Sequence, residues 1–250
     1  MELLKVDNLH KTFKKNKAPA VYGASFSIFK GEVLGLVGES GCGKSTLAKL
    51  ILRLIPADKG TIFYKGRDLL KTDYSDMRKM RKNLQIIFQD PYASLDPRMK
   101  IGNVIEEVYD IHKNAPGCDR RNKAIELLET VGLGESYLNR LPSELSGGER
   151  QRVGIARALA TEPEFIICDE PVSSLDISIQ AQILNLLIDI QKKKSLTYLF
   201  ISHDLGVIAS ICDRVMVMQN GKFVESGSCE DIFKTPRHEY TKTLLASALL

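Results

Sequence analysis

The sequence has no long hydrophobic run. Its longest apolar stretches, residues 196–201 and 244–250, are short and interrupted by polar side chains. A membrane-spanning helix needs about 20 apolar residues in succession. The first residues alternate apolar side chains with Glu2 and Lys5, which does not give the apolar centre of a signal peptide. We therefore expect a chain without a membrane span that remains in the compartment where it is made.

Cysteine is scarce and shows no pairing pattern. The five cysteines are odd in number, and no two of them are spaced as CxxC. A disulfide framework needs an even set, and a zinc site usually contains closely spaced cysteine pairs. The pattern therefore favours free thiols in a reducing compartment such as the cytosol.

The charge excess is also small. Thirty-five basic and 31 acidic residues leave a net charge of +4 over 250 residues. A dedicated nucleic-acid binder would carry a concentrated basic surface, so we expect no nucleic-acid partner. The hydrophobic content of 44% allows a substantial core, and the length indicates one large domain or a core with a subdomain.

Apolar runs alternate with helical patterns along the chain. Residues 33–37 form an apolar run, and the leucine and isoleucine residues from Leu47 to Leu54 then recur at the spacing of one helix face. A second helical pattern extends from Ile179 to Ile190. Further apolar runs lie at residues 85–88, 165–168 and 197–201. Strands that alternate with helices predict an α/β fold with a mostly parallel sheet.

Three regions depart from this alternation. Residues 1–30 and 61–64 contain shorter alternating strands, which predict an antiparallel β flank. Residues from about 90 to 160 show helical patterns without a convincing strand, which indicates an inserted helical subdomain. Residues 214–225 alternate and turn at Asn220-Gly221, a strong hairpin signal, and we expect this strand pair to close the fold. The whole chain then forms a single domain whose core comprises residues 1–89 and 161–250.

The glycine-rich segment after residues 33–37 matches G-x-x-x-x-G-K-[ST], and it lies between a predicted strand and a predicted helix. Such a loop points backbone N–H groups at phosphates, and the helix adds its positive end. Lys44 would reach the β- and γ-phosphates, and Ser45 would bind Mg²⁺. The alternative is a glycine-rich turn before a helix, but the context favours a nucleotide site.

We expect thiol reagents to inhibit hydrolysis by labelling Cys42 and crowding this site. The candidate nucleotide-binding residues are Gly38, Glu39, Ser40, Gly41, Cys42, Gly43, Lys44, Ser45 and Thr46.

Two acidic residues end the apolar run at 165–168. Because ligands bind at the carboxyl ends of parallel strands, Asp169 is expected beside Ser45, where it would hold Mg²⁺ through water. Glu170 would then polarise the water that attacks the γ-phosphate, as a catalytic base. Surface acids after a buried strand are common by themselves, but together with the phosphate-binding loop they favour catalysis.

Polar side chains follow two other predicted strands. His203 comes after residues 197–201, where an imidazole would orient the attacking water and Glu170. The alternative is that Ser202 and Asp204 cap the next helix and His203 has no catalytic role. Position alone leaves both interpretations open. Gln89, after residues 85–88, is only suggestive by itself.

The segment Leu145-Ser-Gly-Gly-Glu-Arg-Gln151 resembles the signature of ABC-transporter ATPases. Ser146 and Glu149 also have the S-x-x-E spacing of a capping box, and the two interpretations are compatible. An exposed helix N-terminus attracts an anion. In the ABC family that anion is the γ-phosphate of ATP bound by the other subunit, which the resemblance assigns here to Ser146, Gly147, Gly148 and Glu149.

The resemblance implies roles for further residues along the chain. Gln89 is similar to the glutamine that contacts Mg²⁺ and relays the nucleotide state to the membrane partner. Asp176 lies in the counterpart of the D-loop, residues 173–176, and His203 corresponds to the switch histidine. Phe13 would stack on adenine, with Tyr22 as a competing candidate. Lys44, Glu170 and His203 are then the catalytic residues.

Three segments point to a branch of the family. Residues 89–98, 178–182 and 236–242 resemble the ATPases of oligopeptide, dipeptide and nickel importers. The resemblance implies an ATP-hydrolysing, Mg²⁺-dependent subunit at the cytoplasmic face of the membrane. Its partners would be a second ATPase subunit, identical or homologous, a membrane permease and an extracytoplasmic substrate-binding protein. The rival is a soluble ABC ATPase not coupled to transport, and the sequence leaves the cargo open.

Overall fold

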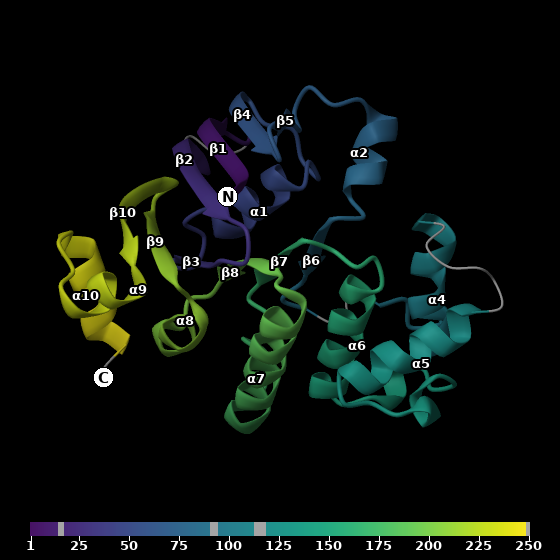
Figure 1. The fold of residues 1–250 in the computed structure, drawn as a ribbon. Helices are drawn as coiled ribbons and strands as arrows, with labels where there is room; N and C mark the ends of the chain where they lie inside the picture. Colours follow the sequence, from purple (N-terminus) through teal and green to yellow (C-terminus); the bar gives the residue numbers. More distant parts are fainter. Residues whose placement is uncertain (15–17, 91–94, 113–118, 249–250) are drawn as a thin grey trace.

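A computed structural model describes residues 1–14, 18–90, 95–112 and 119–248. Residues 91–94, which carry part of the resemblance to peptide and nickel importers, lie outside the described ranges. Two sheets and the helices around them form the fold (Figure 1). The sheets and helices confirm the α/β fold class, with its mostly parallel sheet, antiparallel flank and helical insertion.

A six-stranded sheet lies at the centre of the fold. Five of its strands are parallel, and only β10 is antiparallel to its neighbour. Three of them, β3, β7 and β8, are buried at every position, as expected for parallel strands covered on both faces. The carboxyl ends of the parallel strands consequently meet at one edge. The strand order is β10 (Lys222–Ser228), β9 (Arg214–Gln219), β3 (Val33–Val37), β8 (Thr197–Ile201), β7 (Phe165–Asp169) and β6 (Leu84–Ile87).

A four-stranded antiparallel sheet forms the predicted flank. Its apolar residues, such as Leu4 and Val6, share one buried cluster with Leu47 and Leu50 of α1 (Lys44–Ile51) and with Leu36 of β3. The helix that follows β3 therefore packs against the core of both sheets. The strand order is β2 (Val21–Phe29), β1 (Glu2–Lys11), β4 (Lys59–Tyr64) and β5 (Arg67–Asp68).

The end of α1 differs from the prediction. The helical pattern was expected to run from Leu47 to Leu54, but the helix ends at Ile51 and Leu54 is 48% exposed. Arg53 adopts a left-handed φ of 51°, and the Leu54 N–H donates to the Lys49 carbonyl, a bonding pattern that terminates helices. The Arg53 guanidinium donates to the carbonyls of Leu69 and Thr72, which holds this residue in place. Leu54 therefore continues the apolar spacing of the helix in the sequence, although it lies beyond the end of the helix.

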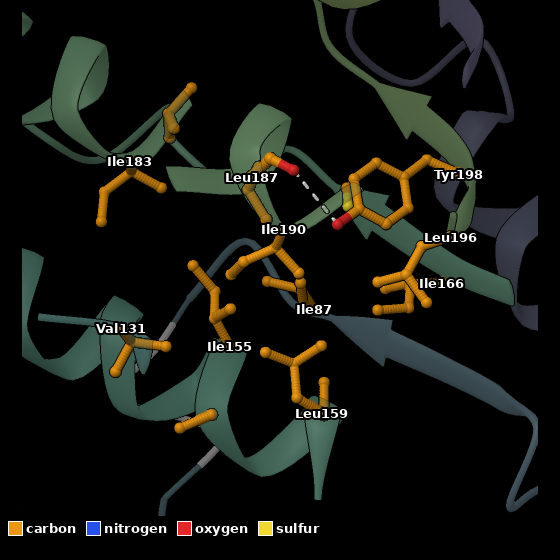
Figure 2. Close-up of a cluster of buried hydrophobic side chains, with 14 of the residues drawn as sticks. Ile87, Val131, Ile155, Leu159, Ile166, Ile183, Leu187, Ile190, Leu196 and Tyr198 are labelled. Atoms are coloured by element: carbon orange, nitrogen blue, oxygen red, sulfur yellow. Dashed lines mark hydrogen bonds between the residues drawn. The ribbon is translucent and has the colours of Figure 1, made fainter. Parts of the chain in front are cut away.

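Between β6 and β7 the described residues contain helices and no strand. Figure 1 shows α4, α5 and α6 grouped on one side of the molecule, next to α7. Figure 2 shows Ile155 of α6 near Ile190 of α7, within a buried cluster that also contains Leu159 and Leu187 and continues to the main sheet. The helical segment therefore shares its core with the sheet. Its elements are α4 (Ile101–His112), α5 (Arg120–Thr130), η2 (Glu135–Tyr137), η3 (Pro142–Glu144) and α6 (Gly147–Leu159).

The hairpin turn is confirmed, but the hairpin does not close the fold. Asn220 and Gly221 have φ values of 46° and 79°, the two positive angles of a type I′ turn. However, β9 pairs with β3 inside the main sheet, and two further helices follow β10. The expectation of a closing strand pair is wrong because apolar residues of the tail, such as Leu244 and Leu245, also form a helix that packs on the core.

The remaining helices are α2 (Tyr74–Met80), α7 (Ile177–Lys194), α8 (Leu205–Ile211), α9 (Cys229–Lys234) and α10 (Glu239–Ala248). In Figure 1, α9 and α10 lie beside β10, on the opposite side of the molecule from α4 and α5. Across the described ranges, none of the helices has the length and apolar character to cross a membrane.

Candidate nucleotide-binding site

The glycine-rich loop joins β3 to α1 and is closely packed at Gly38 and Gly43. Gly38 and Gly43 have φ values of 153° and 114°, which other residues rarely adopt. A Cβ atom on Gly38 would lie 2.2 Å from the Met218 carbonyl oxygen, and one on Gly43 would lie 2.0 Å from the Ala20 carbonyl oxygen. Both positions therefore require glycine for conformation and for space.

The lysine of the loop is folded back over it. Lys44 is only 4% exposed, and its Nζ donates to the carbonyl oxygens of Gly38 (2.7 Å) and Glu39 (3.0 Å). Because α1 begins at Lys44, directly after Gly43, the positive end of the helix lies at the loop. An anion at this point would therefore meet an ammonium group and the end of a helix dipole.

A pocket of about 310 Å³ opens beside the loop. Its size is at the lower end of the usual range for small-ligand sites. The predicted residues Gly38, Glu39 and Cys42 are not among the described residues that line it. Glu39 and Gly38 contact the Lys44 amine instead, and Cys42 is buried. The lining residues are Phe13, Ala20, Ser40, Gly41, Gly43, Lys44, Ser45, Thr46, Gln89 and Glu170.

Ser45 and Asp169 meet as the sequence predicted. The Ser45 hydroxyl donates to Asp169 Oδ1 at 3.1 Å, although the two residues are 124 positions apart. Asp169 is 6% exposed, and its burial raises the pKa of its carboxyl above the ordinary value, which the Ser45 hydrogen bond opposes. A buried carboxylate and a hydroxyl are hard oxygen donors of the kind that Mg²⁺ takes. The residues present therefore fit this ion.

The described residues hold no group of three or more His, Cys, Asp or Glu side chains that could bind a metal by themselves. Mg²⁺ commonly takes one or two protein ligands and completes its shell with water and substrate phosphates. Near the phosphate-binding loop, Ser45, Asp169 and Gln89 would supply this small number of protein ligands. A cation here would therefore depend on a phosphate-bearing ligand.

Two predicted residues, Gln89 and His203, converge on Glu170. Its Oε2 accepts a hydrogen bond from Gln89 Nε2 at 3.1 Å and lies 3.1 Å from His203 Nδ1. The carboxylate is 9% exposed and lines the pocket. Three strand ends, those of β6, β7 and β8, supply these side chains, as the parallel topology predicts.

The backbone of Glu170 is strained. Its φ of 49° is unusual for a residue other than glycine, and such conformations persist where the surrounding structure imposes them. The Glu170 N–H donates to the Ile201 carbonyl at 3.0 Å, and the Ser173 hydroxyl donates to the Glu170 carbonyl at 3.2 Å. These bonds hold the carboxylate toward the pocket.

The predicted helix cap after β8 is present, and His203 lies beside Glu170. Asp204 caps α8 by accepting the N–H groups of Gly206 and Val207, and Ser202 accepts the Asp204 N–H. The His203 ring takes no part in this cap and contacts Glu170 instead. Capping and the histidine contact are therefore compatible.

The two candidate adenine-stacking residues are separated. Phe13 lines the pocket and is 38% exposed, with the Lys11 amine 5.6 Å from its ring centroid. Tyr22 is not among the described lining residues. Its ring packs edge-on against His10 at 5.0 Å, and the Lys222 amine lies 4.7 Å from its centroid. The geometry therefore favours Phe13.

The capping box predicted at the start of α6 is present. The Ser146 hydroxyl accepts the Glu149 N–H at 3.3 Å, and Glu149 Oε2 accepts the Ser146 N–H at 2.7 Å. Tyr137, which sequence reasoning missed, donates its hydroxyl to Glu149 Oε1 at 2.5 Å. This bond is the main reason why the pKa of Glu149 is lowered, followed by the Ser146 N–H. No local signal marks Tyr137, because the contact depends on how η2 packs against α6.

Glycine allows α6 to approach α7 closely. A Cβ atom on Gly148 would lie 2.6 Å from Ile179 Cγ2, and one on Gly147 would lie 3.3 Å from Leu175 Cδ2. The two glycines therefore serve the packing of α6 against the segment that begins α7. Substitution at either position would push the helix N-terminus away from its support.

The structure does not bring every predicted residue to the pocket. Ser146, Gly147, Gly148, Glu149 and Asp176 are absent from the described residues that line it. Asp176 is exposed at the start of α7, and the adjacent Ile177 is 85% exposed. Ser146 is exposed like Asp176, whereas Gly147, Gly148 and Glu149 are half-buried.

Together, the parallel sheet, the glycine-rich loop before α1 and the acidic residues that end β7 define a P-loop nucleotide-binding protein. The ABC transporter family matches residues 21–173, which is more than half of the chain. The chain belongs to the ABC transporter family, as the resemblance at residues 145–151 predicted, and it is an ATPase of the kind coupled to transport.

Known relatives extend this result over nearly the whole chain. The oligopeptide transport ATP-binding protein OppF of Bacillus subtilis (strain 168) is 49% identical over 98% of this chain and 82% of its own length. The dipeptide transport ATP-binding protein DppF of Haemophilus influenzae is 46% identical over 94% of this chain and 72% of its own. Among solved structures, the dimeric post-hydrolysis state of the ATP-binding cassette MJ0796 bound to ADP and Pi has a TM-score of 0.81. It is 28% identical and covers 91% of this chain and 99% of its own.

Proposed function

We propose that the chain is the ATP-hydrolysing subunit of an importer that takes up peptides through a separate membrane permease. The convergence of Gln89 and His203 on Glu170, beside a phosphate-binding loop, is the observation that carries the hydrolytic part. The cargo is argued from the two relatives, which are named for oligopeptide and dipeptide transport. We therefore favour peptides over nickel.

The pocket residues divide the work of holding ATP. Phe13 stacks on adenine, the loop N–H groups and the α1 N-terminus bind the phosphates, and Lys44 exchanges its loop carbonyls for phosphate oxygens. Ser45, Asp169 and Gln89 hold Mg²⁺, which supplies charge neutralisation at the phosphates when it is bound. The contact between Ser45 and Asp169 supports this assignment.

Glu170 acts as the catalytic base. Its carboxylate accepts a proton from the water molecule as that water attacks the γ-phosphate, and the bond from the γ-phosphorus to the β,γ-bridging oxygen breaks so that ADP leaves. His203, at 3.1 Å from the carboxylate, positions Glu170 and the water, and Gln89 holds the same oxygen until the nucleotide is in place. The strained backbone at Glu170 supports this role, since such strain clusters at active sites.

A second ATPase subunit completes the site. Because Ser146, Gly147, Gly148 and Glu149 lie away from the pocket of their own chain, we propose that they bind the γ-phosphate of ATP held by the partner. Asp176 lies in the same interface. The pair then closes on ATP, and hydrolysis reopens it.

The two parts of the domain have different tasks in this scheme. Residues 1–89 and 161–250 form the nucleotide-binding core, and residues from about 90 to 160 form the helical subdomain that carries the signature. The pair docks on the permease at the cytoplasmic face of the membrane. An extracytoplasmic binding protein delivers the peptide.

Peptide uptake by cells tests this proposal. Deletion of the gene should abolish uptake of labelled oligopeptides, the intact chain should restore it, and Lys44→Ala should fail to restore it while the chain still accumulates. The tagged chain should copurify with a membrane protein of several spans. Normal uptake in the deletion strain, or copurification with nucleic acid and no membrane protein, would contradict the proposal and favour a soluble ABC ATPase.

A further inference from the structure

Two contacts connect the last third of the chain to the phosphate-binding loop. The Glu39 N–H donates to the hydroxyl oxygen of Tyr240 in α10, at 3.1 Å and across 201 positions. The Gly221 N–H, in the turn between β9 and β10, donates to the Cys42 carbonyl at 2.9 Å. The loop is thus held from outside at two of its own peptide groups.

Tyr240 and the phosphate-binding Lys44 both bind the backbone of Glu39. The N–H of Glu39 donates to Tyr240, and the carbonyl of the same residue accepts Lys44 Nζ at 3.0 Å. The Cys42 N–H also donates to that carbonyl, at 3.3 Å. Rotation of the Glu39 backbone would therefore break three bonds together, and the tyrosine opposes it.

Tyr240 is itself firmly held. The Glu225 carboxylate of β10 accepts the N–H groups of Arg237 (2.8 Å) and His238 (3.0 Å) just before α10. The His238 ring nitrogen Nδ1 in turn accepts the Tyr240 N–H at 3.1 Å. The Tyr240 ring packs against the main buried cluster, together with Leu244.

The hydroxyl stays neutral in the working range of pH. Burial raises the pKa of Tyr240 above its ordinary value, so the phenol keeps its proton near pH 7. A neutral hydroxyl accepts the Glu39 N–H through a lone pair. The contact is therefore available whenever ATP binds.

We propose that Tyr240 is a positioning residue of the nucleotide site, through which α10 holds the phosphate-binding loop in its ATP-binding conformation. The inference rests on the proposed function in that it takes the pocket to bind ATP. It assigns a task to the segment from β10 to α10 that none of the nucleotide-binding motifs covers. Loss of the hydroxyl frees the Glu39 peptide. The loop must then become ordered when ATP binds, which makes the binding free energy less favourable.

The test removes the hydroxyl alone, by Tyr240→Phe in the full-length chain. The dissociation constant for ATP and its KM should rise about three- to tenfold, the effect of one hydrogen bond, while kcat stays within about twofold. Hydrogen–deuterium exchange at Glu39 should become faster without nucleotide. Glu225→Gln, which weakens the anchor of α10, should raise the dissociation constant to a smaller extent.

The matched control is Tyr198→Phe, which removes a buried hydroxyl that donates to the Leu187 carbonyl at 3.3 Å. This variant should lower thermal stability without changing ATP affinity or exchange at Glu39. If Tyr240→Phe lowers only thermal stability and leaves ATP affinity unchanged, the inference is wrong while the proposed function stands. Failure of the unmodified chain to bind ATP would overturn both.

Discussion

At the scale of single residues, Phe13 and Tyr22 differ in what they face. Phe13→Ala should weaken ATP binding about tenfold, because stacking of a base on an aromatic ring contributes roughly 1–3 kcal/mol. Tyr22→Ala removes a ring that packs on His10 and Lys222 and should leave the affinity nearly unchanged. Titration with a fluorescent ATP analogue measures both variants. Equal losses would show that both rings contact the nucleotide.

The thiol of Cys42 gives a second test at this scale. Burial raises the pKa of Cys42, and the thiolate is the reactive form, so labelling should be slow at neutral pH and become faster as the pH rises. Labelled chains should lose ATPase activity, and bound ATP should protect them. The ATPase activity of Cys42→Ser should be unaffected by the reagent, even though the partly exposed Cys229 is still labelled. Complete labelling of Cys42 with full activity would contradict this account.

The site residues that sequence could predict lie within short motifs or directly after strands. Ser40, Gly41 and Gly43 to Thr46 lie in the glycine-rich motif, and Asp169, Glu170 and His203 follow strands whose ends converge in a parallel sheet. Tyr137 and Tyr240 could not be predicted in this way. Each makes its contact through the packing of separate elements, which leaves no local pattern in the sequence.

At the scale of elements, the approach of α6 to α7 depends on Gly148. Gly148→Ala should destabilise the chain by about 1–3 kcal/mol, because the new methyl group overlaps Ile179. The double variant Gly148→Ala with Ile179→Ala should recover part of this loss.

Gly154→Ala is the matched control in the same helix. Among the described residues, no heavy atom outside its chain neighbours and its own helix backbone lies within 4 Å of its Cβ position, so alanine should stabilise the helix by about 0.5–1 kcal/mol. Chemical denaturation measures all three, and a harmless Gly148→Ala would contradict the packing argument.

The attachment of α10 should weaken in acid. Burial by itself would raise the pKa of Glu225, but the Thr241 side chain and the N–H groups of Arg237 and His238 hold the net value below the ordinary one. The stabilising contribution is therefore present above the ordinary glutamate pKa of about 4.3 and is lost as the pH falls through the lower folded value. The difference in unfolding free energy between the unmodified chain and Glu225→Gln should shrink over that interval. A constant difference down to pH 3 would argue against the anchor.

Element boundaries show what local patterns can and cannot predict. The turn at Asn220-Gly221 was predictable because both residues tolerate positive φ. The end of α1 was not, since Leu54 continues the apolar spacing beyond a cap that depends on distant carbonyl partners of Arg53. The place of β9 beside β3 was also missed, because strand order follows from tertiary packing.

At the scale of the whole molecule, the arrangement of the two sheets determines where the nucleotide pocket lies. The buried residues serve two sheets and one helical segment, and much of the nucleotide site lies where the parallel strands end. The signature residues, Ser146 to Glu149, are not among the described residues that line this pocket. Under the proposed function, the signature residues of a second ATPase subunit complete the site, and a separate permease forms the membrane path.

Hydrolysis by Glu170→Gln tests the central claim most directly. In a single-turnover assay with radiolabelled ATP, this variant should bind ATP, retain it uncleaved and turn over about 10²–10⁴ times more slowly than the unmodified chain. The control is Glu162→Gln, another glutamate with positive φ that is exposed and should behave like the unmodified chain. Near-normal hydrolysis by Glu170→Gln would contradict the assignment of the catalytic base, and with it the proposed mechanism.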